Sequence, residues 1–94
     1  MQVRWTTPAT QDLEKITLYI QKDSGRAAEA VAKTLFDSAN SLDLLPSRGR
    51  TGRIPGTREL VVPDLPYTIV YQIDEVAIQI LHIYHGARNW PEKQ

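Results

Sequence analysis

Apolar and polar side chains alternate between positions 58 and 84, and this alternation predicts three consecutive strands. The expected strands are Arg58–Val62, Tyr67–Ile73 and Val76–Tyr84. Side chains two residues apart in a strand point to the same side, so each strand sorts its residues onto two faces. Because only short turns separate the strands, they are expected to pair antiparallel.

The last two expected strands are separated only by Asp74 and Glu75, which is the spacing of a two-residue hairpin turn. Three opposed pairs follow from this turn and form one aromatic and aliphatic face, which is suited to a core. They are Tyr71 with Ile78, Ile69 with Ile80, and Tyr67 with His82. The second face is smaller and more polar, and it is expected to stay available to a partner. It carries Thr68, Val70, Gln72, Ala77, Gln79 and Leu81, with Ile83 and His85 beyond.

Two amphipathic helices are predicted before these strands, because apolar residues recur there at intervals of three or four positions. Thr7 is the expected N-cap of the first helix, Pro8 suits its first turn, and the helix is expected to end near Lys22. The second helix is expected over about Arg26–Leu45, where Pro46 stops it. The turn between the helices is short, so they are expected to form an antiparallel hairpin.

One further short strand is predicted over Gln2–Thr6, where β-branched and aromatic residues suit a pleated surface. The resulting order is β-α-α-β-β-β within a single domain spanning residues 1–94. This order predicts an α+β fold, in which the N-terminal helical hairpin packs on one face of an antiparallel sheet.

The composition limits the chemistry that this domain can perform. There is no cysteine, which excludes disulfide bonds and thiolate metal sites. No phosphate-binding glycine motif, nucleophile elbow or metal-ligand spacing is present, so neither a cofactor nor a metal is expected. The N-terminus does not have the pattern of a signal peptide, and no apolar run approaches the length of a membrane span. We therefore expect a cytoplasmic protein without a membrane partner.

Positive charge is concentrated in one segment, although the net charge of the whole chain is zero. Residues 46–62 contain one acid, Glu59, and four arginines, which are Arg48, Arg50, Arg53 and Arg58. Glycines between the arginines allow a partner to approach the backbone closely. Two interpretations remain open: the arginines contact phosphate or an acidic protein surface, or they solvate a loop too rich in glycine and proline for a regular element.

Three stretches of the chain together resemble the RelE/ParE superfamily of bacterial toxins. They are VRWTTPATQDLEKITLYI, GRIPGTRELVVPDLPYTIVYQI and ILHIYHGARNWP. The similarity covers almost the whole chain, and the combination of PGTREL, PYxIVY and HGARxWP is fairly specific. The resemblance implies the toxin half of a type II toxin–antitoxin pair, a class linked to growth inhibition and plasmid stabilization. It also implies a cognate antitoxin protein that wraps and neutralises the toxin.

Two activities are known in this superfamily. RelE-like members cleave mRNA in the ribosomal A site, whereas ParE-like members inhibit DNA gyrase. Metal-independent RNA cleavage needs acid–base groups and cations around the phosphate, and the expected open face is poor in both. Thr68, for example, stands where similar ribonucleases carry an arginine. The sequence therefore favours a ParE-like gyrase inhibitor without catalysis of its own, and the alternatives are a ribosome-dependent mRNA endoribonuclease or a non-toxic interaction domain.

Each remaining candidate residue has two interpretations. His85, expected on the open face, is a general acid–base candidate with Glu59 as its second group, or a structural histidine bonded to a carbonyl. The face of Glu59 depends on the register across the turn that follows its strand. His82 is expected to be structural and to lie on the core face. Arg88 and Trp90 have two interpretations as well. They contact a partner, as Arg and Trp often do at interfaces, or Trp90 packs over a sheet edge while Arg88 stays solvated.

Overall fold

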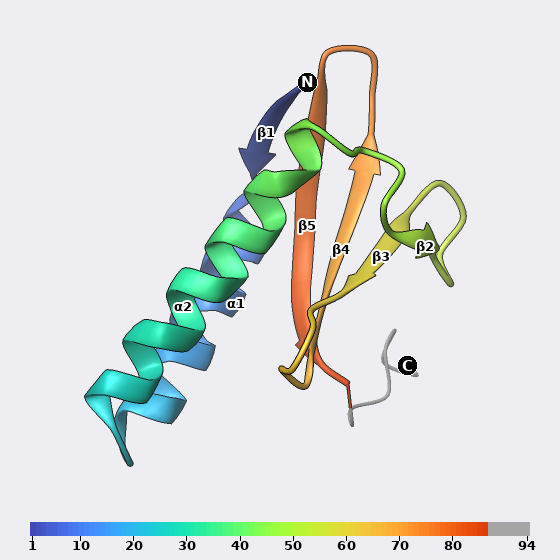
Figure 1. Cartoon of the computed structure of the whole chain (residues 1–94). Helices are drawn as coiled ribbons and strands as arrows, with labels where there is room; N and C mark the ends of the chain where they lie inside the picture. Colours follow the sequence, from blue (N-terminus) through green and yellow to red (C-terminus); the bar gives the residue numbers. More distant parts are fainter. Residues whose placement is uncertain (87–94) are drawn as a thin grey trace.

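The computed structural model describes residues 1–86, in which two helices lie against a five-stranded sheet (Figure 1). This arrangement confirms the predicted α+β fold with an N-terminal helical hairpin. The strand order in the sheet is β1-β5-β4-β3-β2. The elements are β1 (Gln2–Trp5), α1 (Thr7–Gln21), α2 (Gly25–Asn40), the 3-10 helix η1 (Ser41–Asp43), β2 (Arg50–Thr51), β3 (Arg58–Val61), β4 (Tyr67–Ile73) and β5 (Ala77–His85).

The sheet differs from the predicted antiparallel sheet at both of its edges. β1 pairs in parallel with β5, from Gln2 opposite Ala77 to Trp5 opposite Ile80, whereas the other pairs are antiparallel. At the opposite edge, the arginine-rich segment expected to be loop contributes the two-residue strand β2, which pairs with Arg58 and Glu59 of β3. The sheet is therefore mixed, and its last strand, β5, lies between β1 and β4.

The helix boundaries are set by hydroxyl side chains. Thr6, and not the predicted Thr7, is the N-cap of α1, because its Oγ1 accepts a hydrogen bond from the Ala9 amide at 3.4 Å. Helix α2 ends at Asn40, five residues before the predicted Leu45, and the chain continues into η1. Leu45 is exposed, so it does not extend the buried stripe of α2. Within residues 1–86, no helix is long and apolar enough to span a bilayer.

The turn between β4 and β5 is longer than the predicted two-residue turn. The Asp74 amide donates to the Ala77 carbonyl at 2.9 Å, and Asp74 Oδ1 accepts from the amides of Val76 and Ala77 at 2.9 and 2.7 Å. This side chain stabilises an Asx-type turn over Asp74–Ala77. The predicted register was therefore wrong, because Ile73 and not Tyr71 lies opposite Ile78.

The predicted core face survives this error, because a shift of two residues leaves every side chain on the same side of its strand. Tyr71 lies opposite Ile80 and not opposite Ile78. All three side chains have no exposed surface. The expected hydrophobic face of the hairpin is thus confirmed, although the residues that lie opposite each other across β4 and β5 differ from those predicted.

A β-bulge then reverses the faces in the second half of β5. Leu81 has no opposite residue, so His82 lies opposite Val70 and Ile83 lies opposite Ile69. Ile83 thereby takes the core position that was predicted for His82. His85, which was predicted on the open face, lies opposite Tyr67 on the core side. Both histidine placements were wrong for this one reason, since an extra residue inverts the alternation that follows it.

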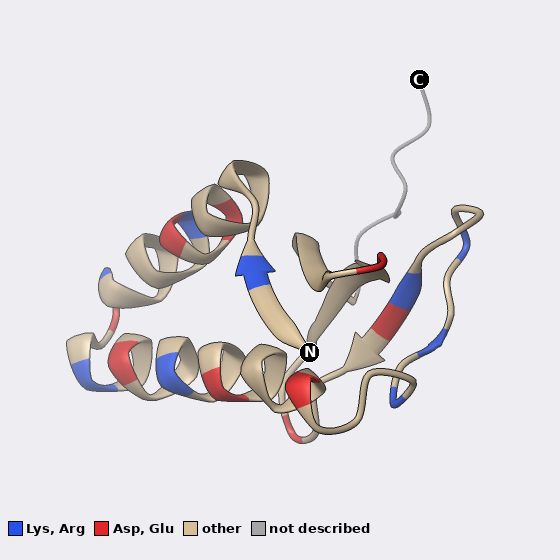
Figure 2. Cartoon of the chain, turned by 90° about the horizontal axis from the view of Figure 1, so that it is seen from above, with Lys and Arg blue, Asp and Glu red and all other residues tan. Residues whose placement is uncertain are grey.

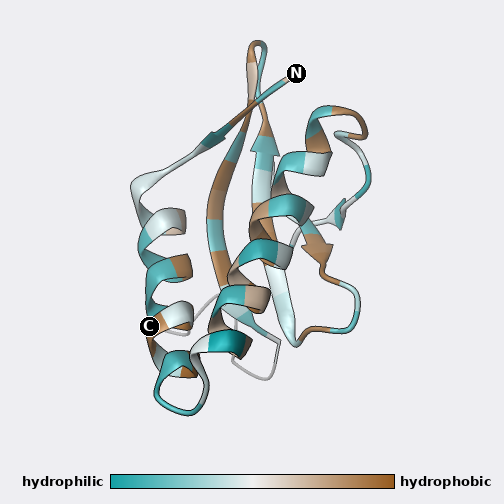
Figure 3. Ribbon diagram, turned by 60° about the vertical axis from the view of Figure 1, so that its left-hand side comes forward, coloured by the Kyte–Doolittle hydropathy of each residue, from teal (hydrophilic) through white to brown (hydrophobic). Residues whose placement is uncertain are grey.

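The core lies between the helical hairpin and one face of the sheet. Figure 3 shows both helices in front of the sheet, with hydrophobic positions in brown on the strands behind them. The buried cluster draws side chains from every layer, so burial of apolar area is the main force that holds the hairpin on the sheet. Its members are Ala9, Leu35, Ala39, Leu42, Leu60, Val62, Tyr67, Ile69, Tyr71, Ile78, Ile80 and Ile83.

Candidate functional site: a buried glutamate beside two arginines

Glu59 lies in the middle of β3, on the sheet face that points away from the core. It is opposite Arg50 on β2 and Val70 on β4, and only 1% of its side chain is exposed. Within the described chain, its carboxylate accepts hydrogen bonds from Arg50 Nη2 at 3.1 Å, the Arg53 amide at 2.9 Å and the Tyr84 hydroxyl at 3.1 Å. Arg53 Nε lies 3.9 Å away and adds an ion pair. The charge of this buried carboxylate is therefore compensated from three separate elements.

The loop between β2 and β3 brings Arg53 to this carboxylate. The Gly52 amide donates to the Thr57 carbonyl at 2.8 Å, and Thr57 Oγ1 donates to the Ile54 carbonyl at 2.6 Å. A Cβ atom at Gly52 would clash with Thr57 Oγ1, so the close approach requires glycine. Gly56 has a φ of 83°, which glycine adopts without the strain that other residues incur. The glycine spacing seen in the sequence thus shapes a closed loop.

Tyr71 fastens the preceding segment, residues 46–49, to the sheet. Its hydroxyl donates to the Pro46 carbonyl at 2.7 Å and accepts from the Gly49 amide at 2.8 Å. Arg58 Nη1 donates to the Gly49 carbonyl at 2.8 Å. A Cβ atom at Gly49 would lie 2.7 Å from the Tyr71 hydroxyl, so this contact also depends on glycine.

The four arginines predicted as one group therefore separate into two kinds. Arg50 and Arg53 surround Glu59. Arg58 donates to backbone carbonyls of the 46–49 segment, and Arg48 Nη1 donates to Ser41 Oγ at 2.9 Å. The geometry thus gives Arg48 and Arg58 contacts that support the fold, and it brings Arg50 and Arg53 together as one charged site.

The protonation states of Glu59 and Tyr84 follow from their contacts. Burial alone would raise the pKa of Glu59, but the hydrogen bonds from Arg53, Arg50 and Tyr84, with the charge of Arg53, together hold it below its ordinary value of 4.5. Burial raises the pKa of Tyr84 above its ordinary value of 10.0, and the adjacent Glu59 carboxylate raises it further. At neutral pH Glu59 is ionised and Tyr84 keeps its proton, so Glu59 has no proton to supply as a general acid.

The lowered pKa of Glu59 predicts how stability depends on pH. A carboxyl group with a lower pKa in the folded state stabilises the fold above its unfolded pKa, and this contribution is lost as the pH falls through the folded value. We therefore expect the free energy of unfolding to decrease once the pH drops below 4.5. Urea titrations across this range measure the effect. The Glu59→Gln variant should show a smaller pH dependence, and an unchanged dependence in that variant would contradict the assignment.

His85 lies in a groove on the other side of the sheet. Its ring packs edge-on against the ring of Tyr67, with centroids 5.5 Å apart. The groove has a volume of about 470 Å³ and runs between α1 and the end of β5. It is lined by Asp12, Lys15, Ile16, Tyr19, Tyr67, Ile83, Tyr84 and His85. The two acid–base candidates from the sequence, His85 and Glu59, thus lie on opposite faces of the sheet.

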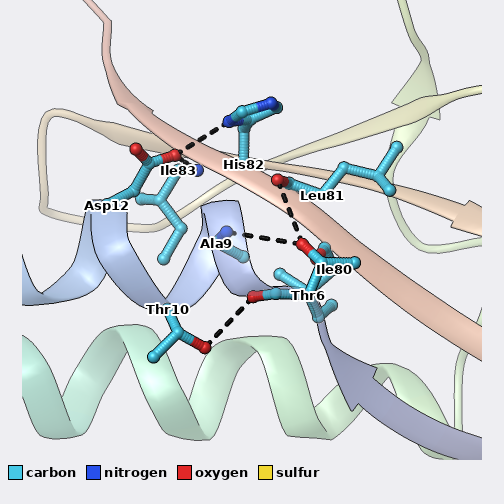
Figure 4. Close-up of polar contacts among 8 residues, drawn as sticks. All are labelled: Thr6, Ala9, Thr10, Asp12, Ile80, Leu81, His82 and Ile83. Carbon is cyan, nitrogen blue, oxygen red and sulfur yellow. Dashed lines mark hydrogen bonds and ion pairs between the residues drawn. The ribbon is translucent and has the colours of Figure 1, made fainter.

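His82 is held at the edge of β5 by Asp12 of α1 (Figure 4). Asp12 Oδ2 lies 3.0 Å from His82 Nδ1 and also accepts the Ile83 amide at 3.0 Å. This carboxylate occupies the position that a neighbouring strand's carbonyl would fill, since β1 pairs with β5 only as far as Ile80. The prediction that His82 bonds to a neighbour is confirmed, whereas its predicted core position was wrong.

Arg88 and Trp90 lie outside the described residues. Tyr84 was not a candidate, because the uninterrupted alternation placed it on the core side and its contact with Glu59 depends on the bulge. Within residues 1–86, no three metal-ligating side chains come together.

Comparison with known proteins places this helical hairpin on a mixed sheet in a class of small toxins from type II toxin–antitoxin systems, and it also gives the family. The chain belongs to the family described as the ParE toxin of the type II toxin–antitoxin system parDE, whose model matches residues 3–90. The recognised similarity to the RelE/ParE superfamily is thereby confirmed.

The curated relatives are named as toxins, and one of them carries a RelE name. The chain is 40% identical to the putative toxin Y4kP of Sinorhizobium fredii, a match that covers 97% of this chain and 94% of that protein. It is 39% identical to Toxin RelE2 of Caulobacter vibrioides, with 93% and 97% covered. These full-length matches support a toxin of this superfamily without separating its two activities.

Two solved structures share the fold to different degrees. One is from the chromosomal ParDE toxin–antitoxin system of P. aeruginosa, with a TM-score of 0.85 and 25% identity, covering 90% of this chain and 95% of that one. The other is from the RelBE2 toxin–antitoxin complex of Mycobacterium tuberculosis, with a TM-score of 0.56 and 27% identity, covering 89% and 95%. At similar identity, the backbone is much closer to the ParDE structure.

Proposed function

We propose that this chain is a growth-inhibiting toxin that acts in the cytoplasm by binding DNA gyrase, and that a cognate antitoxin neutralises it. The single observation that carries the choice of target is the state of Glu59. Its carboxylate is buried, ionised and already bonded to Arg50, Arg53 and Tyr84, and it lies on the opposite face from His85. General acid–base cleavage of RNA needs such groups close to one phosphate. The family and the TM-score of 0.85 to the ParDE structure support the same choice.

A supercoiling assay with purified gyrase tests the proposed target. We expect the protein to inhibit supercoiling and to leave cleaved DNA bound to gyrase. Addition of the purified cognate antitoxin should restore supercoiling, because the antitoxin removes the toxin. Unchanged supercoiling at a large excess of the protein would contradict gyrase as the target. Normal growth of cells that express the chain would favour the third hypothesis, a non-toxic interaction domain.

Cleavage of mRNA on the ribosome is the second candidate, and the relative named RelE2 favours it. In this hypothesis His85 acts as the acid–base group, and Arg53, Arg58 or Arg88 holds the phosphate. A translating extract separates the candidates in one experiment. Cleavage by the wild-type chain that His85→Ala abolishes would replace the gyrase proposal, whereas intact mRNA with both proteins would exclude the ribonuclease.

A further inference from the structure

The site around Glu59 presents two arginines at the surface. The side chains of Arg50 and Arg53 are 56% and 52% exposed, although the carboxylate that they share is almost completely buried. Figure 2 shows the basic positions, in blue, gathered along β3 and the loop that leads into it. An arginine held by an ion pair loses less side-chain freedom when it binds a ligand than a free arginine does. The buried glutamate therefore prepares two exposed guanidinium groups for an anion.

The charges of Arg50, Arg53 and Glu59 indicate which kind of anion this site can bind. Within residues 1–86, one Glu59 carboxylate pairs with the guanidinium groups of both Arg50 and Arg53, so positive charge is in excess among these three side chains. The β4 side chains on the same face, Thr68, Val70 and Gln72, carry no charge. A nucleic acid strand binds through a row of cations that follows its phosphates, whereas the neighbouring Arg48 and Arg58 already donate to Ser41 and to backbone carbonyls of the 46–49 segment. The arrangement fits an isolated carboxylate better than a polyanion.

Apolar surface beside the arginines indicates what surrounds that carboxylate. Val61 is two residues from Glu59 on the same face of β3 and is 51% exposed. Ile54, next to Arg53 in the loop, is 37% exposed. An acidic side chain flanked by apolar residues would match both features at once.

We propose that Arg50 and Arg53 form a carboxylate clamp for an acidic and apolar segment of the antitoxin. In this arrangement Glu59 is a positioning residue, which keeps both guanidinium groups at the surface without touching the partner. The inference rests on the proposed toxin–antitoxin pair. It goes further by assigning the contact to two of the four arginines in this segment and by giving the chemistry of the partner that they bind.

Isothermal titration tests the clamp, with the purified product of any small reading frame that adjoins this chain's own as the partner. We expect Arg50→Gln and Arg53→Gln each to weaken binding about tenfold, since each removes a charged hydrogen-bond donor at the contact. Added salt should weaken binding of the wild-type chain more than that of either variant. Arg26→Gln, an exposed arginine of α2, is the matched control and should bind as the wild type does.

The possible outcomes separate the clamp from the toxin–antitoxin pair itself. If the wild-type chain does not bind the neighbouring product, the proposed pair fails and the clamp fails with it. If the wild type binds and both arginine variants bind equally well, only the clamp is overturned. If both variants still bind the antitoxin but no longer bind single-stranded RNA in a gel-shift assay, the site binds a nucleic acid. That result also overturns the clamp.

Two further variants distinguish positioning from charge and from folding. Glu59→Gln raises the positive charge of the site, so a site acting by charge alone would bind the acidic partner more tightly. The positioning role predicts weaker binding, and a gain in affinity would overturn it. Arg50→Lys preserves the ion pair with Glu59 but replaces the planar guanidinium group with an ammonium group. This variant should therefore bind the antitoxin segment more weakly, whereas its unfolding temperature should equal that of the wild type. Wild-type affinity for the antitoxin in this variant would contradict recognition by the planar guanidinium group of Arg50.

Discussion

Tyr71→Ala is expected to lower the free energy of unfolding by about 3–5 kcal/mol, the range for removing a large aromatic side chain from a core. Tyr71 has no exposed surface, and it packs beneath the helical hairpin within the central cluster. It also carries the hydroxyl that joins Pro46 and Gly49 to the sheet. Because a domain of this size has only about 5–15 kcal/mol of total stability, this single change removes a large part of it.

Chemical denaturation followed by circular dichroism measures this loss, and two other variants show its origin. Tyr71→Phe retains the ring and removes only the hydroxyl, so it should cost about 1–3 kcal/mol through the unpaired backbone groups. Tyr19→Ala is the matched control: Tyr19 is 70% exposed, and its loss should change stability by about 0.5 kcal/mol or less. Equal effects at Tyr71 and Tyr19 would contradict the assigned core.

Removal of both arginines that pair with Glu59 is the second change with a large expected effect. Arg50→Met with Arg53→Met leaves a buried carboxylate without either guanidinium. Breaking a buried ion pair in this way costs about 3–5 kcal/mol, and we expect about 3 kcal/mol because the Arg53 amide and the Tyr84 hydroxyl still donate.

A compensating variant makes this second prediction specific. Adding Glu59→Gln to the double variant removes the uncompensated negative charge of the buried carboxylate. The triple variant should therefore have a larger free energy of unfolding than the double variant in the same denaturation experiment. Such a recovery is the non-additive behaviour expected of residues in one network. Further loss of stability in the triple variant would show that the arginines stabilise the fold independently of Glu59.

Periodicity was sufficient to predict both helices, the strands β1, β3, β4 and β5, and the core face of the hairpin, because these depend mainly on burial of apolar side chains. Tyr71, Ile78 and Ile80 lie in the core as the alternation predicted. The same alternation failed beyond Leu81, where the bulge inverts it. Asp12 accepts the Ile83 amide after the bulge, and this contact comes from a helix distant in sequence. No local pattern could have reported it.

The site around Glu59 was only partly predictable, for a related reason. The sequence indicated an arginine-rich segment and a nearby acid. It did not indicate that Glu59 is buried, because its face depends on register and its partners come from a loop and from Tyr84, 25 residues away in the chain. Nor did it separate Arg50 and Arg53 from Arg48 and Arg58, since these side chains differ only in the distant atoms that they reach.

The pairing of β1 with β5 has a consequence during protein synthesis. The strand made first borders the one made last, and Thr6 Oγ1 bonds to the Ile80 carbonyl across 74 positions of the chain. Contacts between such distant residues form slowly, because the intervening chain must first be ordered. A nascent chain therefore cannot complete its sheet until translation has passed His85, the end of β5. Under the proposed function, a ribosome carrying an unfinished copy holds no active toxin, and antitoxin already in the cell can capture each molecule as it folds.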